Sequence, residues 1–150
     1  MFSIRQREES KDCILEIAGK DSRLVSCAFV GSTAEGTDRW SDLYLTFGVG
    51  TEYSVQDVLN DWTLKMQHEF SAVHLFDLQS DSMTYRVFLL PGNLQVGLSF
   101  TPESDFGVIG PRFRLLYGRI VQKKWPEAPT PSSLFGLAAH YLVRARICIE

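Results

Sequence analysis

The segment from Leu24 to Leu45, LVSCAFVGSTAEGTDRWSDLYL, gives the clearest indication of the fold. Its first seven residues are largely apolar and are bounded by turn-forming residues, so they predict a buried strand over Leu24–Val30. A polar loop follows, and the next apolar run predicts a second strand over Leu43–Val49. Because side chains alternate between the two faces of a strand, we expect the apolar residues of this second strand on one face and Asp42 on the other.

The remaining chain shows helical and strand-like patterns in an order typical of an α/β (α+β) domain. Helices are expected over Ser3–Gly19, from Ser54 onward, and over Ser132–Glu150. Further strands are expected over Ala72–Leu78, Thr84–Leu90 and Leu94–Phe100. The type of the short apolar segment Phe113–Tyr117 stays open. We therefore predict a mixed β-sheet flanked by helices, with a C-terminal helix.

Local signals mark the ends of several of these elements. Ser3 and Gln6 have the spacing of a capping box at the start of the first helix. Ser54, with Asp57 three residues later, opens the second long helix. The run Pro91-Gly92-Asn93 separates two strand-like segments and predicts a hairpin turn. These signals place the helices and turns independently of the hydrophobic pattern.

Proline residues divide the chain into an N-terminal domain and a final helix. We assign residues 1–125 to one domain and residues 126–131, which contain Pro126, Pro129 and Pro131, to a Pro-rich linker. Residues 132–150 are expected to form an amphipathic helix, because Leu134, Leu137, Ala138, Tyr141 and Leu142 recur at spacings of three and four.

Composition excludes several classes of protein. The chain has 150 residues, 45% of them hydrophobic, and a net charge of −3 from 15 basic and 18 acidic residues, which argues against disorder. The slight acidity argues against nucleic acid held mainly by bulk charge. We find no apolar stretch long enough to span a membrane and no secretory signal. The three cysteines show no C-x-x-C spacing, so we expect a reducing, cytoplasmic location.

The loop between the first two strands carries the most specific functional signal. Gly31 and Ser32 form a turn that can present backbone N–H groups and a hydroxyl to a phosphate. Asp42 stands at the mouth of the next strand, where its carboxylate could hold a divalent cation. Each part alone is weak evidence, but the ordered combination of strand, G-S-x-A-x-G turn and S-D-L-x-L strand is far more specific.

In these residues the chain resembles the nucleotidyltransferase superfamily, which has a polymerase-beta-like fold, and most of all the bacterial aminoglycoside and lincosamide nucleotidyltransferases. The resemblance implies Mg²⁺-dependent transfer of a nucleoside monophosphate from ATP or another triphosphate to a small hydroxylated acceptor. The family pattern is a Gly-Ser turn, then Asp-x-Asp on the next strand, then a third carboxylate on a neighbouring strand. Gly31, Ser32 and Asp42 match its first parts, and Leu94–Pro102 looks like the segment that carries the third carboxylate. By the same resemblance, the final helix looks like the start of a larger helical region.

The chain departs from the family at two of the three carboxylates. Position 44 is Tyr and position 97 is Gly, so Asp42 is the one expected metal ligand that remains. One carboxylate can hardly position two divalent ions, so we expect catalysis to be impaired or lost. Arg112 and Arg114 are candidates for contacting a triphosphate, although a solvated basic patch is the more common explanation for such a pair.

Three hypotheses about function therefore stay open. The first is an enzyme that binds Mg²⁺ and ATP and modifies a small hydroxylated molecule. The second is a non-catalytic nucleotide-binding or protein-interaction module, motivated by Tyr44 and Gly97. The third is a scaffold that forms homo-oligomers through the apolar stripe of its terminal helix.

Overall fold

The computed structural model of the chain describes residues 1–36, 38–108, 110–121 and 130–149. Its helices are α1 (Ile4–Lys20), α2 (Ser32–Glu35), α3 (Val55–Phe70) and α4 (Leu134–Ile149), with short 3-10 turns at Pro91–Asn93 and Glu103–Asp105. Its strands are β1 (Leu24–Val30), β2 (Leu43–Val49), β3 (Val73–Ser80), β4 (Met83–Leu90), β5 (Leu94–Pro102), β6 (Phe113–Tyr117) and β7 (Thr130–Pro131).

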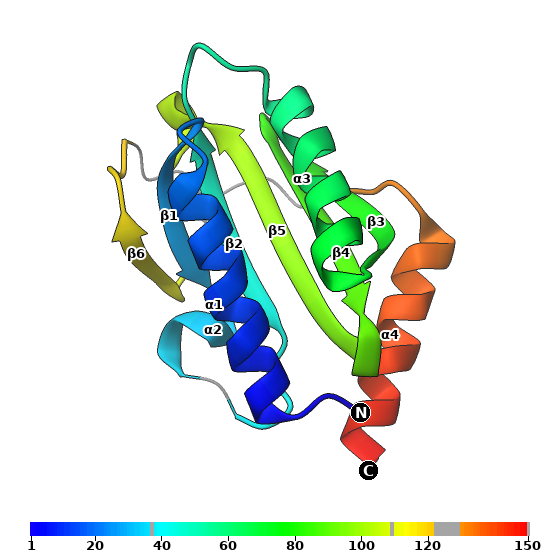
Figure 1. The fold of residues 1–150 in the computed structure, drawn as a ribbon. Helices are drawn as coiled ribbons and strands as arrows, with labels where there is room; N and C mark the ends of the chain where they lie inside the picture. The colour runs from blue at the N-terminus through cyan, green and yellow to red at the C-terminus, as the bar shows by residue number, and fades with distance from the viewer. Residues whose placement is uncertain (37, 109, 122–129, 150) are drawn as a thin grey trace.

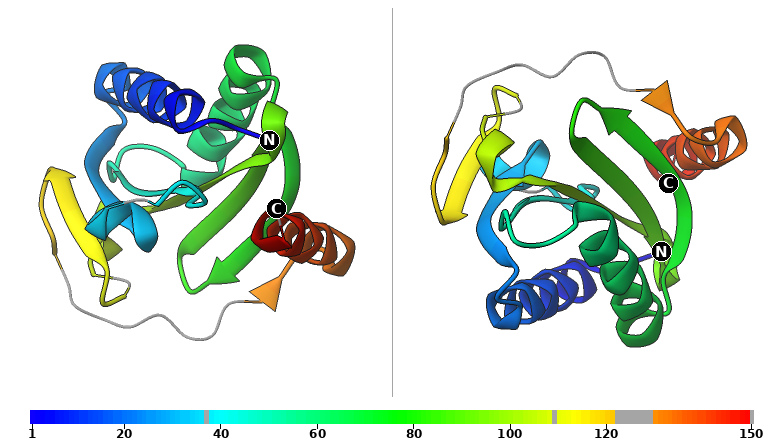
Figure 2. Two further views of the ribbon diagram at one scale, coloured as in Figure 1. Left: turned by 90° about the horizontal axis from the view of Figure 1, so that it is seen from below. Right: turned by 90° about the horizontal axis from the view of Figure 1, so that it is seen from above.

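The strands form one mixed sheet with the order β6-β1-β2-β5-β4-β3-β7. Its two central strands, β2 and β5, run parallel, and the other neighbouring pairs are antiparallel. Figure 1 shows α1 and α3 lying across one face of this sheet. In Figure 2, seen along the sheet, α4 lies apart from these two helices, beside β3. The predicted α+β class with a mixed sheet and a C-terminal helix is therefore confirmed.

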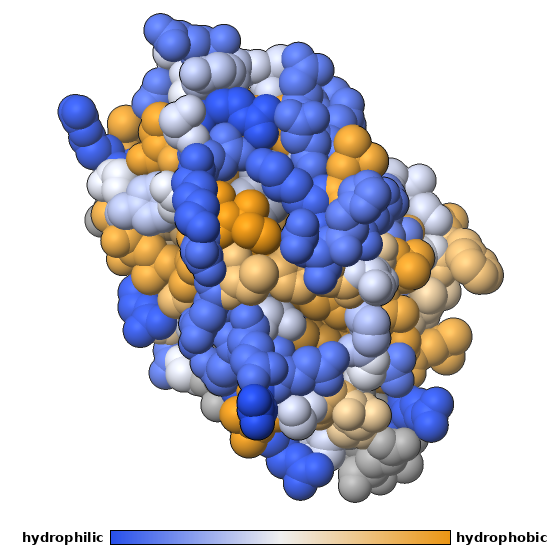
Figure 3. Space-filling view, in the orientation of Figure 1, coloured by the Kyte–Doolittle hydropathy of each residue, from blue (hydrophilic) through white to orange (hydrophobic). Residues whose placement is uncertain are grey.

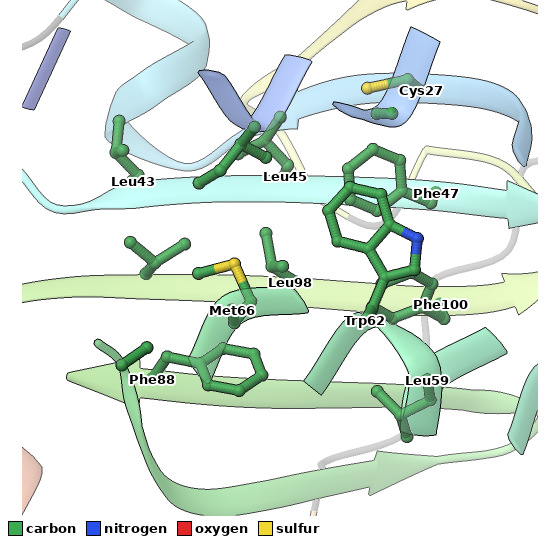
Figure 4. Close-up of a cluster of buried hydrophobic side chains, with 14 of the residues drawn as sticks. Cys27, Leu43, Leu45, Phe47, Leu59, Trp62, Met66, Phe88, Leu98 and Phe100 are labelled. Carbon is green, nitrogen blue, oxygen red and sulfur yellow. The ribbon is translucent and has the colours of Figure 1, made fainter. Parts of the chain in front are cut away.

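The hydrophobic core lies between the sheet and the pair α1 and α3, as the close-up in Figure 4 shows. Alternate residues of β2 and β5 point into it, and Leu45, Phe47 and Phe100 are fully buried there. Trp62 of α3 reaches the same layer, with its ring centroid 5.4 Å from that of Phe47. Burying these side chains is the main stabilising contribution of this face. The residues between them, including Tyr44, are left to face the opposite side of the sheet.

Most of the expected boundaries agree with the structure, and a few differ in detail. Ser3 caps α1 by accepting a hydrogen bond from the Gln6 amide at 3.1 Å, as predicted. The Gln6 side chain, however, donates to the Pro91 carbonyl at 2.8 Å, so the reciprocal half of the capping box is replaced by a tertiary contact. Gly19 lies inside α1, which ends one residue later at Lys20. Residues 113–117, whose type stayed open, form an edge strand beside β1.

The final helix packs on the second face of the sheet, and one glycine permits its close approach. An ideal Cβ on Gly136 would lie 2.2 Å from the backbone oxygen of Leu75 in β3. Pro126 and Pro129 of the expected linker lie outside the described residues, whereas Pro131 belongs to β7. In the described ranges, no helix is both long and apolar enough to cross a membrane.

The two sides of the molecule differ in surface character. Figure 3 shows charged and polar residues along the outer sides of α1 and α3, and hydrophobic residues gathered along the side formed by α4. The most exposed large hydrophobic residues on this helix are Leu134, Phe135, Tyr141 and Leu142. The outer face of α4 is therefore apolar although it is in contact with solvent in this chain.

We expect Gly136→Ala to destabilise the chain, against the usual trend for helices. Replacing a helical glycine by alanine normally stabilises by about 1 kcal/mol. At Gly136 the added methyl would overlap a strand backbone, which is expected to cost about 1–3 kcal/mol and to move α4 away from β3. The free energy of unfolding should therefore fall, as urea denaturation can measure.

Gly19→Ala is the matched control for this substitution. Gly19 is also helical, but it is exposed and an added Cβ would meet nothing within 4 Å. This variant should be unchanged or up to about 1 kcal/mol more stable. Equal effects at the two glycines would contradict the close contact between α4 and β3.

Candidate functional site

Asp42 lies immediately before β2 and its side chain is completely buried. One carboxylate oxygen contacts the Arg144 guanidinium, which reaches down from α4. The Tyr44 hydroxyl donates to this same oxygen at 3.4 Å, and the Gln95 backbone N–H donates to the other oxygen at 3.3 Å. Burial raises the pKa of Asp42, while the positive charge of Arg144 and these hydrogen bonds oppose that rise. The oxygens that were expected to bind a cation are thus already bonded within the protein.

Tyr44 and Gly97 lie directly opposite each other in the parallel pair of β2 and β5. The Tyr44 ring also lies against the Gly-Ser turn, since an ideal Cβ on Gly31 would be 3.3 Å from Tyr44 Cδ2. An ideal Cβ on Gly97 would be 2.9 Å from Tyr44 Cδ1. The structure therefore brings Gly31, Asp42, Tyr44 and Gly97 to one place on the second face of the sheet.

Tyr85 of β4 fills the space above Gly97, and the sequence analysis did not identify it. An ideal Cβ on Gly97 would lie 1.9 Å from the Tyr85 hydroxyl oxygen and 2.4 Å from its Cζ. Burial raises the pKa of Tyr85 well above its ordinary value, and it raises that of Tyr44 to about 12. Both phenols are therefore uncharged at neutral pH, and a neutral aromatic ring occupies the space where the resemblance expects a carboxylate.

The signal for Tyr85 was present in the hairpin between β4 and β5. The turn at Pro91–Asn93 sets the register that pairs Leu90 with Leu94 and Val87 with Gly97. A large residue two positions from Val87 on the same face is then close enough to cover a glycine. Counting back from the turn would have given Tyr85 and Leu89 as the two candidates, of which Tyr85 is the larger.

Two further side chains of the site come from α4, to which the sequence analysis assigned no role in it. Arg144 contacts Asp42, and His140, one helical turn earlier, contacts Gln95 through Nδ1. The Gln95 amide nitrogen donates to the His140 carbonyl at 3.4 Å. Burial, and secondarily the charge of Arg144, lower the pKa of His140. The spacing of four residues puts His140 and Arg144 on one face of the helix, which is a signal that the sequence contained.

The Gly-Ser turn lies at the edge of the site. Gly31 has φ of +59°, a conformation that favours glycine, and its N–H donates to the Arg112 carbonyl at 3.1 Å. Ser32 begins α2, which is four residues long. The Arg112 side chain pairs with Glu35 at 3.1 Å, and both side chains are more than half exposed.

Arg114 has a different environment from Arg112. It lies on β6 with its guanidinium 5.0 Å from the centre of the Phe29 ring. Phe113, between the two arginines, packs against Phe106, and both arginine side chains are exposed. A shallow pocket of about 210 Å³ lies beside the turn and is lined in part by Gly31 and Arg112. Arg112 therefore adjoins the Gly-Ser turn, whereas Arg114 packs on the neighbouring strand.

The side chains of the site do not suit a magnesium ion. Mg²⁺ in proteins is usually held by carboxylates together with substrate phosphates and water. Asp42 is bonded to Arg144, and its neighbours on this face are Tyr44, Gly97 and Gln95, which supply no second carboxylate. Within the ranges that the structure describes, no group of three or more His, Cys, Asp or Glu side chains could hold a metal ion.

Comparisons with known proteins give no independent assignment. No family model matches the chain, and no curated protein matches its sequence. Its function is therefore inferred from the geometry of the site and from the resemblance found in the sequence.

We expect Arg144→Met to destabilise the chain in a pH-dependent way. Removing the arginine leaves a buried carboxylate without its cation, and we expect a loss of about 2 kcal/mol at pH 7, below the usual range because Arg144 is partly exposed. The pKa of Asp42, already raised in the folded chain, should rise further. As the pH falls through that pKa the carboxyl takes up a proton, so the loss should shrink towards pH 5. Urea denaturation at both pH values measures it.

The control is the same substitution in an Asp42→Asn background. Asparagine keeps the shape of the side chain and carries no charge to bury, so Arg144→Met should then cost much less at either pH. The ion pair does not stabilise the chain if the effects of the two substitutions are additive. The same conclusion follows if Arg144→Met lowers the free energy of unfolding equally at pH 5 and pH 7.

Proposed function

We propose that the chain is a non-catalytic binding module built on a nucleotidyltransferase-like scaffold. The order of strand, Gly-Ser turn and strand supports the relation to that superfamily. So does the parallel partner of β2, because it aligns Tyr44 with Gly97, the two positions where the resemblance expects carboxylates. The proximity of Gly31 to the same Tyr44 ring is a further support.

The contact between Asp42 and Arg144 carries the proposal that nucleotidyl transfer has been lost. Transfer by two metal ions needs several carboxylates that hold the ions about 3.5–4 Å apart. The remaining carboxylate is buried and bonded to a cation of the protein itself, and Tyr85 occupies the space above Gly97. These residues do not fit a metal ion, so we derive no catalytic step through one.

The resemblance implies two ligands, which are ATP or another nucleoside triphosphate and a small hydroxylated molecule. The Gly31–Ser32 turn and the adjoining Arg112 support weak contact with a phosphate. Arg112 is already paired with Glu35 at the surface, which reduces what it can contribute. We therefore propose that any nucleotide binding is weak and independent of Mg²⁺.

We expect the wild-type chain to transfer no nucleotide from labelled ATP to a panel of hydroxylated acceptors, with either Mg²⁺ or Mn²⁺ present. Mn²⁺ should also give no rise in Tm beyond that of the Asp42→Asn variant, because the carboxylate is held by Arg144. Metal-dependent transfer that disappears in Asp42→Asn would overturn the proposal.

Restoring the acids supplies the positive control for this assay. Tyr44→Asp with Gly97→Asp alone should lower Tm, because a side chain at position 97 meets Tyr85 at 1.9 Å. Adding Tyr85→Ala removes that overlap, and this triple variant is expected to gain a rise in Tm with Mn²⁺. A triple variant that folds and does not respond would show that the likeness to nucleotidyltransferases is one of shape alone.

A second candidate function is association through α4. Its outer face exposes Leu134 by 77%, Phe135 by 87% and Leu142 by 72%. Contiguous exposed apolar residues mark association surfaces. We expect sedimentation at increasing concentration to show self-association that Phe135→Glu with Leu142→Glu abolishes, and a monomer at every concentration would refute it.

We also infer that the chain works in a reducing compartment, with the cytoplasm as our proposal. Cys13 and Cys27 are free thiols, and burial raises the pKa of Cys27 to about 12. A protonated, buried thiol of this kind is unreactive, and it packs as a small apolar side chain.

A further inference from the structure

A pocket of about 340 Å³ lies between α4 and the second face of the sheet. Its walls include Tyr44, Phe76, Tyr85 and Val87 from the strands, and Leu137 and His140 from the helix. Tyr141 also lines it and is 63% exposed, so this residue lies where the pocket meets solvent. The pocket adjoins the site around Asp42, since Tyr44 and His140 belong to both.

The size and walls of the pocket suit a flat aromatic molecule. Cavities of about 150 Å³ in protein cores hold benzene, and ligand pockets start at about 300 Å³. A volume of about 340 Å³ therefore accommodates one or two fused rings. The rings of Tyr44, Phe76 and Tyr85 offer faces and edges for stacking, and the aliphatic residues complete an apolar lining.

The charges around the pocket favour an uncharged ligand. Among the wall residues that the structure describes, His140 is the one whose ordinary pKa lies near neutral, and burial together with Arg144 lowers that pKa, which favours the neutral ring at pH 7. Arg144 and Asp42 neutralise each other beside the pocket. An anion that entered would lose its hydration without gaining a free cation among the pocket walls, which is unfavourable.

The polar atoms in the pocket wall determine which hydrogen bonds a ligand can make there. The Gln95 amide nitrogen donates to the His140 carbonyl, so its oxygen faces His140 Nδ1, which must carry the ring proton. His140 Nε2 is then left as an acceptor. The Tyr44 hydroxyl donates its proton to Asp42 and keeps lone pairs that can accept. A ligand that donates a hydrogen bond is therefore matched to this wall.

We propose that this pocket binds an uncharged aromatic molecule of one or two rings that carries a hydroxyl or a ring N–H group. The inference rests on the proposed function, since it treats the space beside Tyr44 and Tyr85 as a ligand site and not as a catalytic centre. The donor group of the ligand lies towards His140 and Tyr44, and its rings lie among the aromatic walls.

Three probes of equal size but different chemistry test the proposal on the full chain. They are 2-naphthol, the anion 2-naphthoate, and saturated decahydro-2-naphthol, titrated while backbone amide shifts are followed by NMR. For 2-naphthol we expect a Kd on the order of 100 μM, with shifts centred on β3, β4 and α4 around the pocket. The anion and the saturated alcohol should each bind at least about tenfold more weakly.

Substitutions on α4 provide matched controls for the location. Leu137→Trp places a large ring in the pocket and should abolish binding, whereas Leu142→Trp makes the same change on the exposed outer face and should leave the Kd unchanged. Should circular dichroism show that Leu137→Trp does not fold, Tyr141→Ala at the exposed mouth is used instead, with an expected loss of at least about threefold.

The proposal is overturned if 2-naphthol gives no saturable shifts up to about 1 mM, tenfold above the expected Kd. It is also overturned if the shifts map away from the pocket or if 2-naphthoate binds as tightly. None of these outcomes contradicts the proposed function, which is tested separately by the assay for metal-dependent transfer. Transfer activity that requires Asp42, by contrast, would remove the proposed function whatever the probes do.

Discussion

The parallel pairing of β2 with β5 sets which side chains enter the core and which form the candidate site. It places Leu45 beside Leu98 and Phe47 beside Phe100 on one face, which makes a continuous apolar layer for α1 and α3. Because side chains alternate along both strands, the same pairing places Tyr44 beside Gly97 on the other face. A shift of one residue would exchange the two faces, so the core and the candidate site are determined together.

On that second face Gly97, Tyr85, Tyr44 and Asp42 contact one another, and Arg144 of α4 completes the group. Gly97 has no side chain, and the Tyr85 ring occupies the space that a side chain would need. Tyr44 packs against the same glycine and donates to Asp42, and Arg144 supplies the charge that a buried carboxylate requires. An unpaired carboxylate in this environment would be strongly unfavourable. These contacts fill the space above Gly97 and neutralise the charge of the buried carboxylate.

Helix α4 lies between this group of residues and the solvent. Gly136 lets the helix approach the β3 backbone, which brings His140 and Arg144 over the site and leaves the pocket beneath Leu137. The inner side of α4 is thus engaged with the sheet while its outer side exposes Phe135 and Leu142. One side of the helix therefore contacts the sheet, and the other exposes apolar side chains to solvent.

Local sequence patterns were enough to predict the order of the three long helices and of β1 to β5, the boundaries of β1 and β2, the cap at Ser3 and the two faces of β2. Those features follow from local periodicity and from capping, which depend on residues a few positions apart. Two contacts follow from the tertiary packing alone: Arg144 pairs with Asp42, and Tyr85 fills the space over Gly97. The first pair is separated by 102 positions, and its contact depends on how closely α4 packs on the sheet, which no local pattern specifies. The sequence identified positions 44 and 97 as departures from the pattern that it resembles, and the fold shows which side chains surround them.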